Sequence, residues 1–245
     1  LIKNSKQLCQ KTVVSIFINK LQFAPEEDFD NYPRTIDDDL KNLALLEVDV
    51  VLMPSSKEMY LRNFSFSVYE SIISQKLEGL SRPGFFIGVT TVVSKLFNIV
   101  QPSHSFFGMK DIQQLVIIKN LVKDLNYNIQ IIGCETVREK NGLAMSSRNQ
   151  YLSKQEQEEA AVLYKVLVMG KNLIKQKNAP CETIKKELKK ALQINKNITL
   201  DYLSIAHLNT FEELEGLIIN INKTVISGAI YLNNVRLIDN IVINE

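Results

Sequence analysis

Two short polar clusters in this sequence contain residue types that bind phosphate groups. The first cluster, residues 108–114, reads GMKDIQQ and lies between an apolar run and a helical pattern of apolar residues from Leu115 to Leu125. A strand-to-helix turn of this kind directs free backbone N–H groups and the positive end of a helix dipole toward an anion. Because Lys110 adds a full positive charge, the first cluster predicts a phosphate-binding turn.

The second cluster, residues 143–149, reads LAMSSRN and follows the apolar run 129–133. It adds two hydroxyl groups and the guanidinium of Arg148, which can hold two phosphate oxygens at once. The two clusters together predict a nucleotide site.

Each cluster also has a purely structural interpretation. A single Gly-x-Lys-Asp segment is most often an ordinary turn, and Ser-Ser-Arg-Asn is often a cap before a helix. The order of the elements favours the functional interpretation, since the sequence runs strand, cationic turn, helix, strand and hydroxyl-rich loop. Open α/β sheets bind their ligands at the carboxyl ends of such strands.

The first half of the chain predicts a parallel sheet covered by helices. Residues 12–18 and 48–53 are nearly continuous in apolar and β-branched side chains, as in strands buried on both faces. Between them, Thr35 and Asp38 have the spacing of a capping box that opens a helix. The apolar periodicity of residues 89–100 predicts a further helix, so strands and helices alternate.

The second half has a different character and predicts a separate α+β domain. Ser153 and Glu156 again have capping-box spacing and open a predicted long helix that ends near Lys175. A second helix and two alternating strands are predicted at residues 182–192, 200–208 and 224–232. The hydroxyl-rich cluster lies near the junction of the two domains, where ligand clefts are common.

Composition agrees with a soluble enzyme and says little more about function. The chain has 245 residues, 45% of them hydrophobic, and its 29 basic and 27 acidic residues leave a net charge of only +2, so no nucleic-acid partner is expected. We expect no membrane partner and a cytoplasmic location, since no segment is apolar over the roughly twenty residues that cross a bilayer. The three cysteines lack metal-ligand spacing and are expected to be reduced. His104 and His207 are interpreted as structural.

With these motifs in view, the chain resembles the pantothenate synthetase (pantoate–β-alanine ligase) family. The resemblance runs from Leu1 to about Asn240 through five segments in the family's order. These segments are YPRT at 32–35, SRPG at 81–84, FGMKDIQQ at 107–114, GLAMSSRN at 142–149 and RLIDN at 236–240.

The resemblance implies a fold, a reaction and an assembly. The fold is α/β, with a Rossmann-like nucleotidyltransferase domain at 1–142 that binds ATP and pantoate on a parallel sheet, and a smaller α+β domain at 143–245 that covers the active site. The reaction condenses pantoate with β-alanine to pantothenate through a pantoyl-adenylate, and it releases AMP and pyrophosphate. ATP with Mg²⁺ is the expected cofactor, although no residue is assigned as metal ligand, and a homodimer is the expected assembly.

Site residues follow from the same resemblance, position by position. Lys110 and Arg148 are the expected catalytic residues, because they neutralise phosphate charge. Gln22, Gln114 and Arg82 are expected to bind pantoate, and Gln22 also β-alanine. The residues expected to contact ATP are Gly108, Met109, Lys110, Asp111, Val137, Met145, Ser146, Ser147 and Arg148.

The chain departs from the family pattern in several places. Lys20 stands where the family usually has Pro, Phe85 where it has His, and Met109 where it usually has Glu. Leu1 has no preceding N-cap, so we expect an upstream strand and turn carrying the family's His-x-Gly-His motif. Without that segment, the chain is expected to fail to form pantoyl-adenylate.

Two other functions remain open at this point. A non-catalytic, truncated remnant could keep the fold and bind nucleotide or a partner. Another adenylate-forming nucleotidyltransferase, such as a relative of the class I aminoacyl-tRNA synthetases, would share the chemistry, but the sequence lacks a tRNA-sized basic surface.

Overall fold

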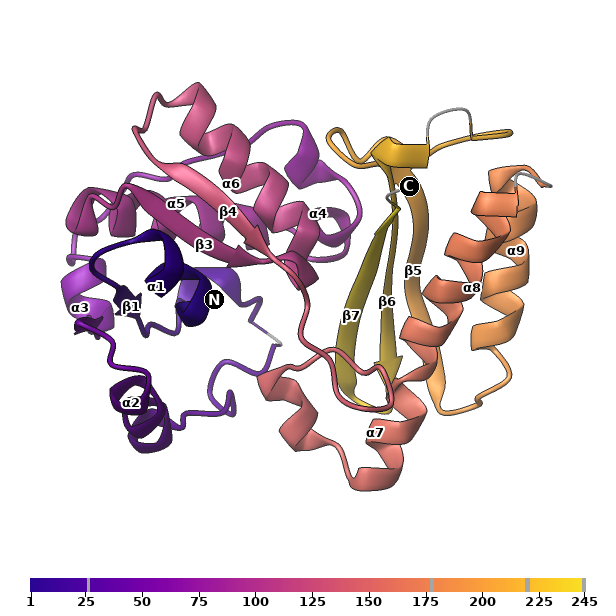
Figure 1. The fold of residues 1–245 in the computed structure, drawn as a ribbon, viewed down its shortest axis with the longest axis horizontal. Helices are drawn as coiled ribbons and strands as arrows, with labels where there is room; N and C mark the ends of the chain where they lie inside the picture. The colour runs from indigo at the N-terminus through magenta and orange to yellow at the C-terminus, as the bar shows by residue number, and fades with distance from the viewer. Residues whose placement is uncertain (26, 177–178, 219–220, 244–245) are drawn as a thin grey trace. The chain divides into compact units, whose positions relative to one another are not determined.

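The chain folds into two compact units in the computed structural model, which describes residues 1–25, 27–176, 179–218 and 221–243. Unit 1 comprises Leu1–Met109 and Gln113–Cys134, and unit 2 comprises Lys110–Ile112 and Glu135–Glu245 (Figure 1). The sequence placed the division after position 142. In the structure the main division falls between Cys134 and Glu135, and residues Lys110–Ile112 also belong to unit 2. No helix in the described part of the chain is long and apolar enough to span a membrane.

Unit 1 contains the predicted parallel strands. Strand β1 (Val13–Ser15) pairs in parallel with β2 (Val50–Leu52), and β3 (His104–Gly108) pairs in parallel with β4 (Gln130–Cys134). The first pair is shorter than the apolar runs that predicted it. Parallel pairing across a helical connection is the arrangement that the alternation of strands and helices indicated.

Helices surround these strands. Helix α5 (Phe85–Val100) begins after Gly84, whose φ of 85° favours glycine, and it ends at Val100, where the apolar periodicity of residues 89–100 also ends. The other helical segments of unit 1, together with η3 at its boundary, are α1 (Ile2–Leu8), η1 (Lys20–Gln22), α2 (Ile36–Leu45), α3 (Ser56–Met59), η2 (Ile73–Gln75), α4 (Glu78–Ser81), η3 (Met109–Asp111) and α6 (Ile112–Asp124).

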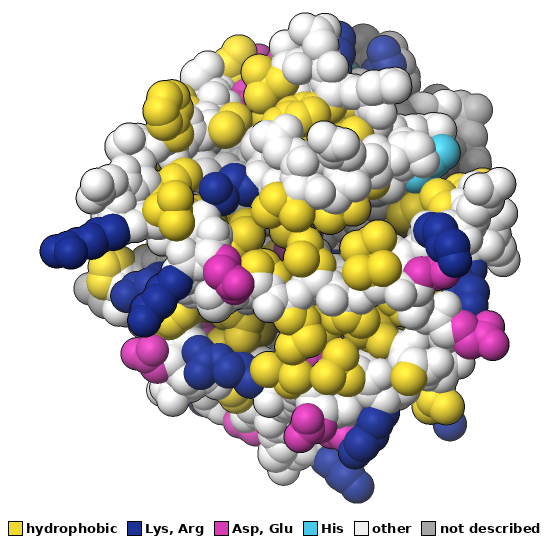
Figure 2. All heavy atoms as spheres, turned by 90° about the vertical axis from the view of Figure 1, so that its left-hand side faces the viewer, with side chains coloured by type: hydrophobic (Ala, Val, Ile, Leu, Met, Phe, Trp, Pro, Cys, Tyr) yellow, Lys and Arg dark blue, Asp and Glu magenta, His cyan; other side chains and the backbone are white. Residues whose placement is uncertain are grey.

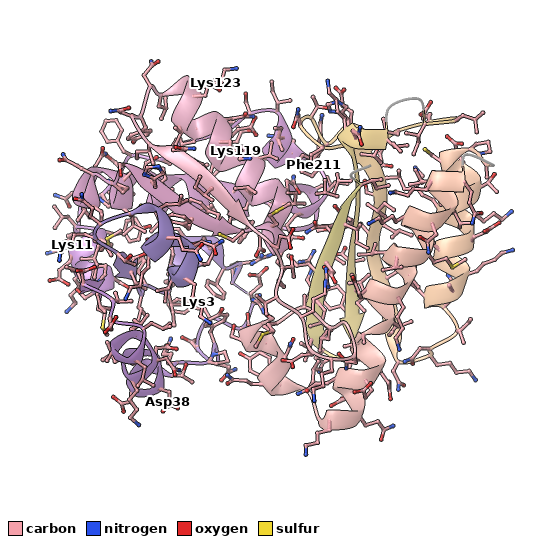
Figure 3. All side chains as sticks on the ribbon, in the orientation of Figure 1. Lys3, Lys11, Asp38, Lys119, Lys123 and Phe211 are labelled. Atoms are coloured by element: carbon pink, nitrogen blue, oxygen red, sulfur yellow. The ribbon has the colours of Figure 1, made fainter. Side chains whose placement is uncertain are left out.

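Helix α6 covers the strand pair β3–β4 closely. A Cβ added to Gly133 of β4 would lie 2.8 Å from Cδ2 of Leu115 on α6, so a larger residue there would displace the end of that side chain. Lys119 and Lys123 lie one turn apart on the same helix and are exposed (Figure 3). Leu125, the last apolar residue of the predicted helical pattern, lies just beyond the end of the helix at Asp124 and is exposed.

The capping box predicted at Thr35 is absent. Helix α2 does start after Thr35, but the Thr35 side chain makes no capping hydrogen bond and its Oγ1 instead donates to Oδ2 of Asp39 at 3.2 Å. A capping box that the sequence analysis did not single out opens α3, where Ser55 and Glu58 exchange hydrogen bonds.

Unit 2 places two helices on a three-stranded antiparallel sheet. The predicted long helix is two helices, α7 (Lys154–Ala160) and α8 (Val162–Gln176), and the capping box of Ser153 and Glu156 is confirmed. Helices α8 and α9 (Cys181–Leu192) cover one face of the sheet (Figure 1). The remaining elements are η4 (Ser147–Tyr151), β5 (Ile198–His207), η5 (Ile221–Lys223), β6 (Thr224–Leu232) and β7 (Val235–Ile243), in the sheet order β5-β6-β7.

Strand β7 was not predicted, and it carries the RLIDN segment. Leu237 and Ile241 lie in the core beneath the helices, so Asp239 between them points to the same face. Asn240 points to the opposite face, beside Ser227 of β6. This edge strand therefore offers a carboxylate on one side and an amide on the other.

The Ser153 cap generates a stability prediction. Ser153 Oγ accepts from the Glu156 N–H at 3.3 Å, and a Glu156 oxygen accepts from the Ser153 N–H at 2.7 Å. Ser153→Ala should lower the free energy of unfolding by about 1 kcal/mol, since one helical N–H loses its acceptor. Urea unfolding followed by circular dichroism measures the change.

Thr35→Ala is the matched control, because Thr35 occupies the same position in α2 without a capping bond. It should change the unfolding free energy clearly less than Ser153→Ala. Equal losses for both variants would show that the Ser153 bond contributes nothing specific.

Candidate functional site

The Lys110 turn has the strand–turn–helix setting that its sequence predicted. Strand β3 ends at Gly108, the 3-10 turn η3 carries Lys110 and Asp111, and α6 follows at once. The Nδ2 of Asn240 donates to the backbone carbonyl of Lys110 at 2.7 Å. The turn is therefore held by β7 through its backbone, which leaves the charged end of the Lys110 side chain outside this bond.

Residues 137–145 form a small hairpin, which we call the 137–145 hairpin. Arg138 and Ala144 form an antiparallel bridge, and the N–H of Met145 donates to the carbonyl of Val137 at 3.0 Å. Gly142 turns the chain with φ 97°, and an added Cβ there would lie 2.5 Å from the Tyr164 ring. Val137 and Met145 are both exposed, so the hairpin presents an apolar surface suited to the flat face of a base.

The hydroxyl-rich loop continues directly from this hairpin. Ser146 Oγ accepts from the Arg148 N–H at 3.3 Å and so caps the turn η4. Asn149 Nδ2 donates to the Ala144 carbonyl at 3.1 Å, and Gln157 Nε2 donates to the Asn149 carbonyl at 3.1 Å. The backbone of Ser146, Ser147 and Arg148 is thus fixed from both ends.

In unit 1, Gln22 ends the short turn η1, which is tied to helix α5. Asn19 accepts from the Leu21 N–H at 3.3 Å and donates to the Gly88 carbonyl at 2.9 Å. The hydroxyl of Tyr60 donates to Asn19 at 2.8 Å, and burial raises the pKa of Tyr60 to about 12, so this donor keeps its proton at neutral pH.

Arg82 lies beside the same turn and is already engaged by carboxylates. Its Nε and Nη2 donate to the two oxygens of Glu27 at 2.7 and 2.6 Å, and Glu78 lies at 3.4 Å. Nη2 also donates to the Gln22 carbonyl at 3.0 Å, and the guanidinium lies 3.9 Å from the centre of the Phe85 ring. This geometry suits Arg82 to hold the backbone of Gln22.

The two neighbouring glutamines of α6 differ sharply. Gln113 is buried and makes three bonds: Nε2 donates to the carbonyls of Ile73 and Lys76 at 2.9 and 2.8 Å, and Oε1 accepts from the Glu78 N–H at 3.1 Å. Gln114 is half-buried and makes no side-chain hydrogen bond within the described chain. Gln113 is therefore structural, whereas the Gln114 amide is not engaged within the described residues.

The residues expected to form the site are divided between unit 1 and unit 2. Gly108, Met109, Gln22, Arg82 and Gln114 lie in unit 1, and the remainder of the expected ATP set lies in unit 2. No group of three or more His, Cys, Asp or Glu side chains that could hold a metal occurs among the residues that the structure describes. The sequence analysis assigned no role to Arg138, Asp239 or Asn240, although RLIDN had marked the last two.

Comparison with known proteins agrees with this arrangement. A family model described as Pantoate-beta-alanine ligase matches residues 1–242. The chain belongs to the pantoate-beta-alanine ligase family. It is 44% identical over 243 residues to a pantothenate synthetase of Acetivibrio thermocellus, with 99% of this chain and 85% of the relative covered. A pantothenate synthetase of Caldicellulosiruptor saccharolyticus is 45% identical over 247 residues, with the same coverage of both chains.

Solved structures agree in fold. The pantothenate synthetase of Thermus thermophilus has a TM-score of 0.94 at 36% identity, covering 99% of this chain and 87% of its own. A pantoate-beta-alanine ligase of Francisella tularensis, complexed with beta-gamma ATP and beta-alanine, has a TM-score of 0.79 at 34% identity, covering 99% and 83%.

These findings confirm the family, the Rossmann-like nucleotidyltransferase fold and the ATP-dependent formation of pantothenate expected from the sequence. This chain is an enzyme of the pantoate-beta-alanine ligase family, an ATP-dependent ligase that forms pantothenate. The alternative of another adenylate-forming nucleotidyltransferase is set aside, because the matches extend over nearly the whole chain.

The contact between η1 and α5 generates a prediction for pantoate binding. A Cβ at Gly88 would lie 2.3 Å from the Leu21 carbonyl oxygen and 2.8 Å from the Gln22 nitrogen. Gly88→Ala should displace the Gln22 turn, raise KM for pantoate more than KM for ATP, and lower the unfolding free energy by about 1–3 kcal/mol. Steady-state kinetics and urea unfolding measure both effects.

Gly170→Ala in unit 2 is the control, since its Cβ would meet Leu188 Cδ1 at 2.7 Å in the core. It should lower stability without a selective change in KM for pantoate. A similar rise in pantoate KM for both variants would contradict a role of the Gln22 turn in pantoate binding.

Proposed function

We propose that this ligase works through a pantoyl-adenylate and that Lys110 and Arg148 neutralise the phosphate charge that develops as the adenylate forms. A carboxylate resists attack by an amine because it is already negative. Transfer of AMP from ATP gives a mixed anhydride with a good leaving group, and β-alanine then displaces AMP. Negative charge rises on the α-phosphate and the departing pyrophosphate, where preorganised cations lower the barrier most.

One observation carries the assignment of the nucleotide to these clusters. The Lys110 turn and the 137–145 hairpin, which leads into Ser146, Ser147 and Arg148, belong to the same compact unit, and both are bonded to strand β7. Two segments far apart in sequence thus offer lysine, hydroxyl and guanidinium groups, a combination suited to a polyphosphate. Gly108, Met109 and Asp111 belong to the same turn, and Val137 and Met145 offer an apolar surface to adenine.

We assign pantoate and β-alanine to unit 1. Gln22 and Gln114 make no side-chain hydrogen bonds within the described residues, so their amides can bind hydroxyl and carboxylate groups. Gln22 would contact both substrates. Arg82 supports pantoate binding by holding the Gln22 backbone, because Glu27 and Glu78 already neutralise its charge.

Magnesium would enter this site with the nucleotide. Mg²⁺ usually keeps several waters and binds through substrate phosphates and one or two carboxylates. The described residues offer no dedicated cluster of ligands, which fits a metal that the triphosphate carries. Bound there, the ion would supply further positive charge beside the phosphates.

We also propose that the enzyme is a homodimer. Apolar side chains exposed on unit 1 support this assembly, and Figure 2 shows a face of the molecule on which apolar groups gather. Burying such groups against a second copy is favourable by about 25 cal/mol per Å². Sedimentation equilibrium distinguishes a dimer from a monomer. The exposed apolar side chains of unit 1 include Val13, Leu45, Val50, Leu61 and Phe66.

Replacing Lys110 tests the nucleotide assignment. Lys110→Ala should reduce kcat/KM for ATP about ten- to over a hundredfold, since a charge-assisted hydrogen bond contributes roughly 1.5–3 kcal/mol. Pantoate-dependent exchange of labelled pyrophosphate into ATP isolates the first half-reaction. Lys119→Ala, an exposed lysine on the helix that follows, is the control and should leave exchange unchanged.

Equal exchange by Lys110→Ala and Lys119→Ala would remove Lys110 from the site. If the unsubstituted protein bound nucleotide but gave neither exchange nor pantothenate, the non-catalytic remnant would be the better description of this chain.

Gln114→Ala is the reciprocal change. It should raise KM for pantoate and leave KM for ATP nearly constant, because the amide is proposed to contact pantoate alone. Equal rises in both KM values would instead indicate that the start of α6 had been disrupted.

A further inference from the structure

Strand β7 holds the 137–145 hairpin through a bidentate ion pair. Nη1 and Nη2 of Arg138 donate to the two oxygens of Asp239 at 2.6 and 3.0 Å. The Asp239 side chain is 3% exposed and that of Arg138 18% exposed. The Asn240 N–H donates to Oδ1 of Asp239 at 2.8 Å, which fixes the carboxylate further. A planar fork against a carboxylate has one preferred geometry, so the pair sets orientation as well as distance.

Arg138 also binds the far side of its own hairpin. Nη1 donates to the Gly142 carbonyl at 3.0 Å, and the guanidinium lies 3.7 Å from the centre of the Tyr164 ring on α8. One guanidinium therefore joins both arms of the hairpin to β7 and to α8. The hairpin leads directly into Ser146, Ser147 and Arg148.

The next residue of β7 holds the other cluster. Asn240 Nδ2 donates to the Lys110 carbonyl at 2.7 Å, across 130 residues of sequence. Consecutive Cα atoms are about 3.8 Å apart, and neighbouring side chains on a strand point to opposite faces. The backbone between Asp239 and Asn240 thus sets the spacing between the lysine turn and the hydroxyl-rich loop.

We propose that Asp239 and Asn240 are positioning residues for ATP and that, with Arg138, they form a clamp on β7 that keeps the two phosphate-binding segments in register. This inference rests on the proposed assignment of ATP to those segments. Neither clamp side chain contacts the nucleotide in this scheme. Their effect arises because small displacements of phosphate-binding groups reduce transition-state stabilisation strongly.

A merely structural ion pair would give a different result, and the chain provides a matched example. On the same strand, Arg236 donates through Nε and Nη2 to Oδ2 of Asp201 on β5, at 3.0 and 2.7 Å. The side chains of Arg236 and Asp201 are 15% and 19% exposed, respectively. This pair joins β7 to β5.

The test compares Asp239→Asn with Asp201→Asn, which remove one carboxylate charge each without changing side-chain size. Pyrophosphate exchange gives KM for ATP, KM for pantoate and kcat, and thermal unfolding gives Tm. Asp239→Asn should raise KM for ATP or lower kcat by about tenfold or more, with KM for pantoate within about twofold. Asp201→Asn should lower Tm while leaving all three kinetic constants within about twofold.

Arg138→Lys and Asn240→Asp test the two contacts of the clamp separately, the first to the 137–145 hairpin and the second to the Lys110 turn. Arg138→Lys keeps the charge but loses the fork, and Asn240→Asp keeps the size but loses the donor to Lys110. Both should impair ATP use selectively. Adding Asp239→Asn to Arg138→Lys should cause little further loss, because both changes remove the same contact. Should Asp239→Asn fail to fold, Asn240→Asp decides the matter.

Two results would overturn the clamp: equal effects of the Asp239 and Asp201 variants on ATP use, or parallel rises in the KM values for ATP and pantoate. Failure of the proposed ATP assignment would give a different result. If Lys110→Ala leaves ATP use unchanged, the nucleotide lies elsewhere. If Lys110→Ala impairs ATP use and the Asp239 and Asn240 variants do not, only the clamp is wrong.

Discussion

The ion pair between Arg138 and Asp239 is the interaction on which the proposed phosphate-binding side of unit 2 depends. It joins residues 101 positions apart, and its carboxylate is almost fully removed from water. Taking two charges out of water is expensive, and geometry this specific offsets the desolvation only while both partners are present. The same guanidinium also binds the carbonyl of the Gly142 turn and stacks on Tyr164.

Local sequence signals gave the elements correctly where one segment determines its own structure. The Lys110 turn, helix α5 and the cap at Ser153 each depend on residues within a few positions of one another. The cap expected at Thr35 is absent because its backbone, at φ −114° and ψ 44°, lies outside the extended conformation that Ser55 and Ser153 adopt as N-caps. The helix expected to run to Lys175 is interrupted near Ala161, although no Gly or Pro marks that position.

Long-range contacts explain what the sequence could not provide. Strand β7 has a recognisable motif, yet nothing local shows that Asp239 meets Arg138 or that Asn240 meets Lys110. Gln113 and Gln114 illustrate the same limit on a small scale. They are adjacent and chemically identical, and only the position of the carbonyls of Ile73 and Lys76 makes the first structural. Phe85, a departure from the family pattern, gains a physical reason from the guanidinium of Arg82 stacked on its ring.

The bond between Asn240 and Lys110 has a consequence for how the protein is made. Chains are synthesised from the N-terminus, and N-terminal parts fold first as they emerge from the ribosome. Strand β3 and helix α6 can form early, but the turn between them meets its partner only after Asn240, 130 positions further along the chain, has emerged. A nascent chain therefore carries the lysine turn without its anchor while the 130 residues up to Asn240 are synthesised.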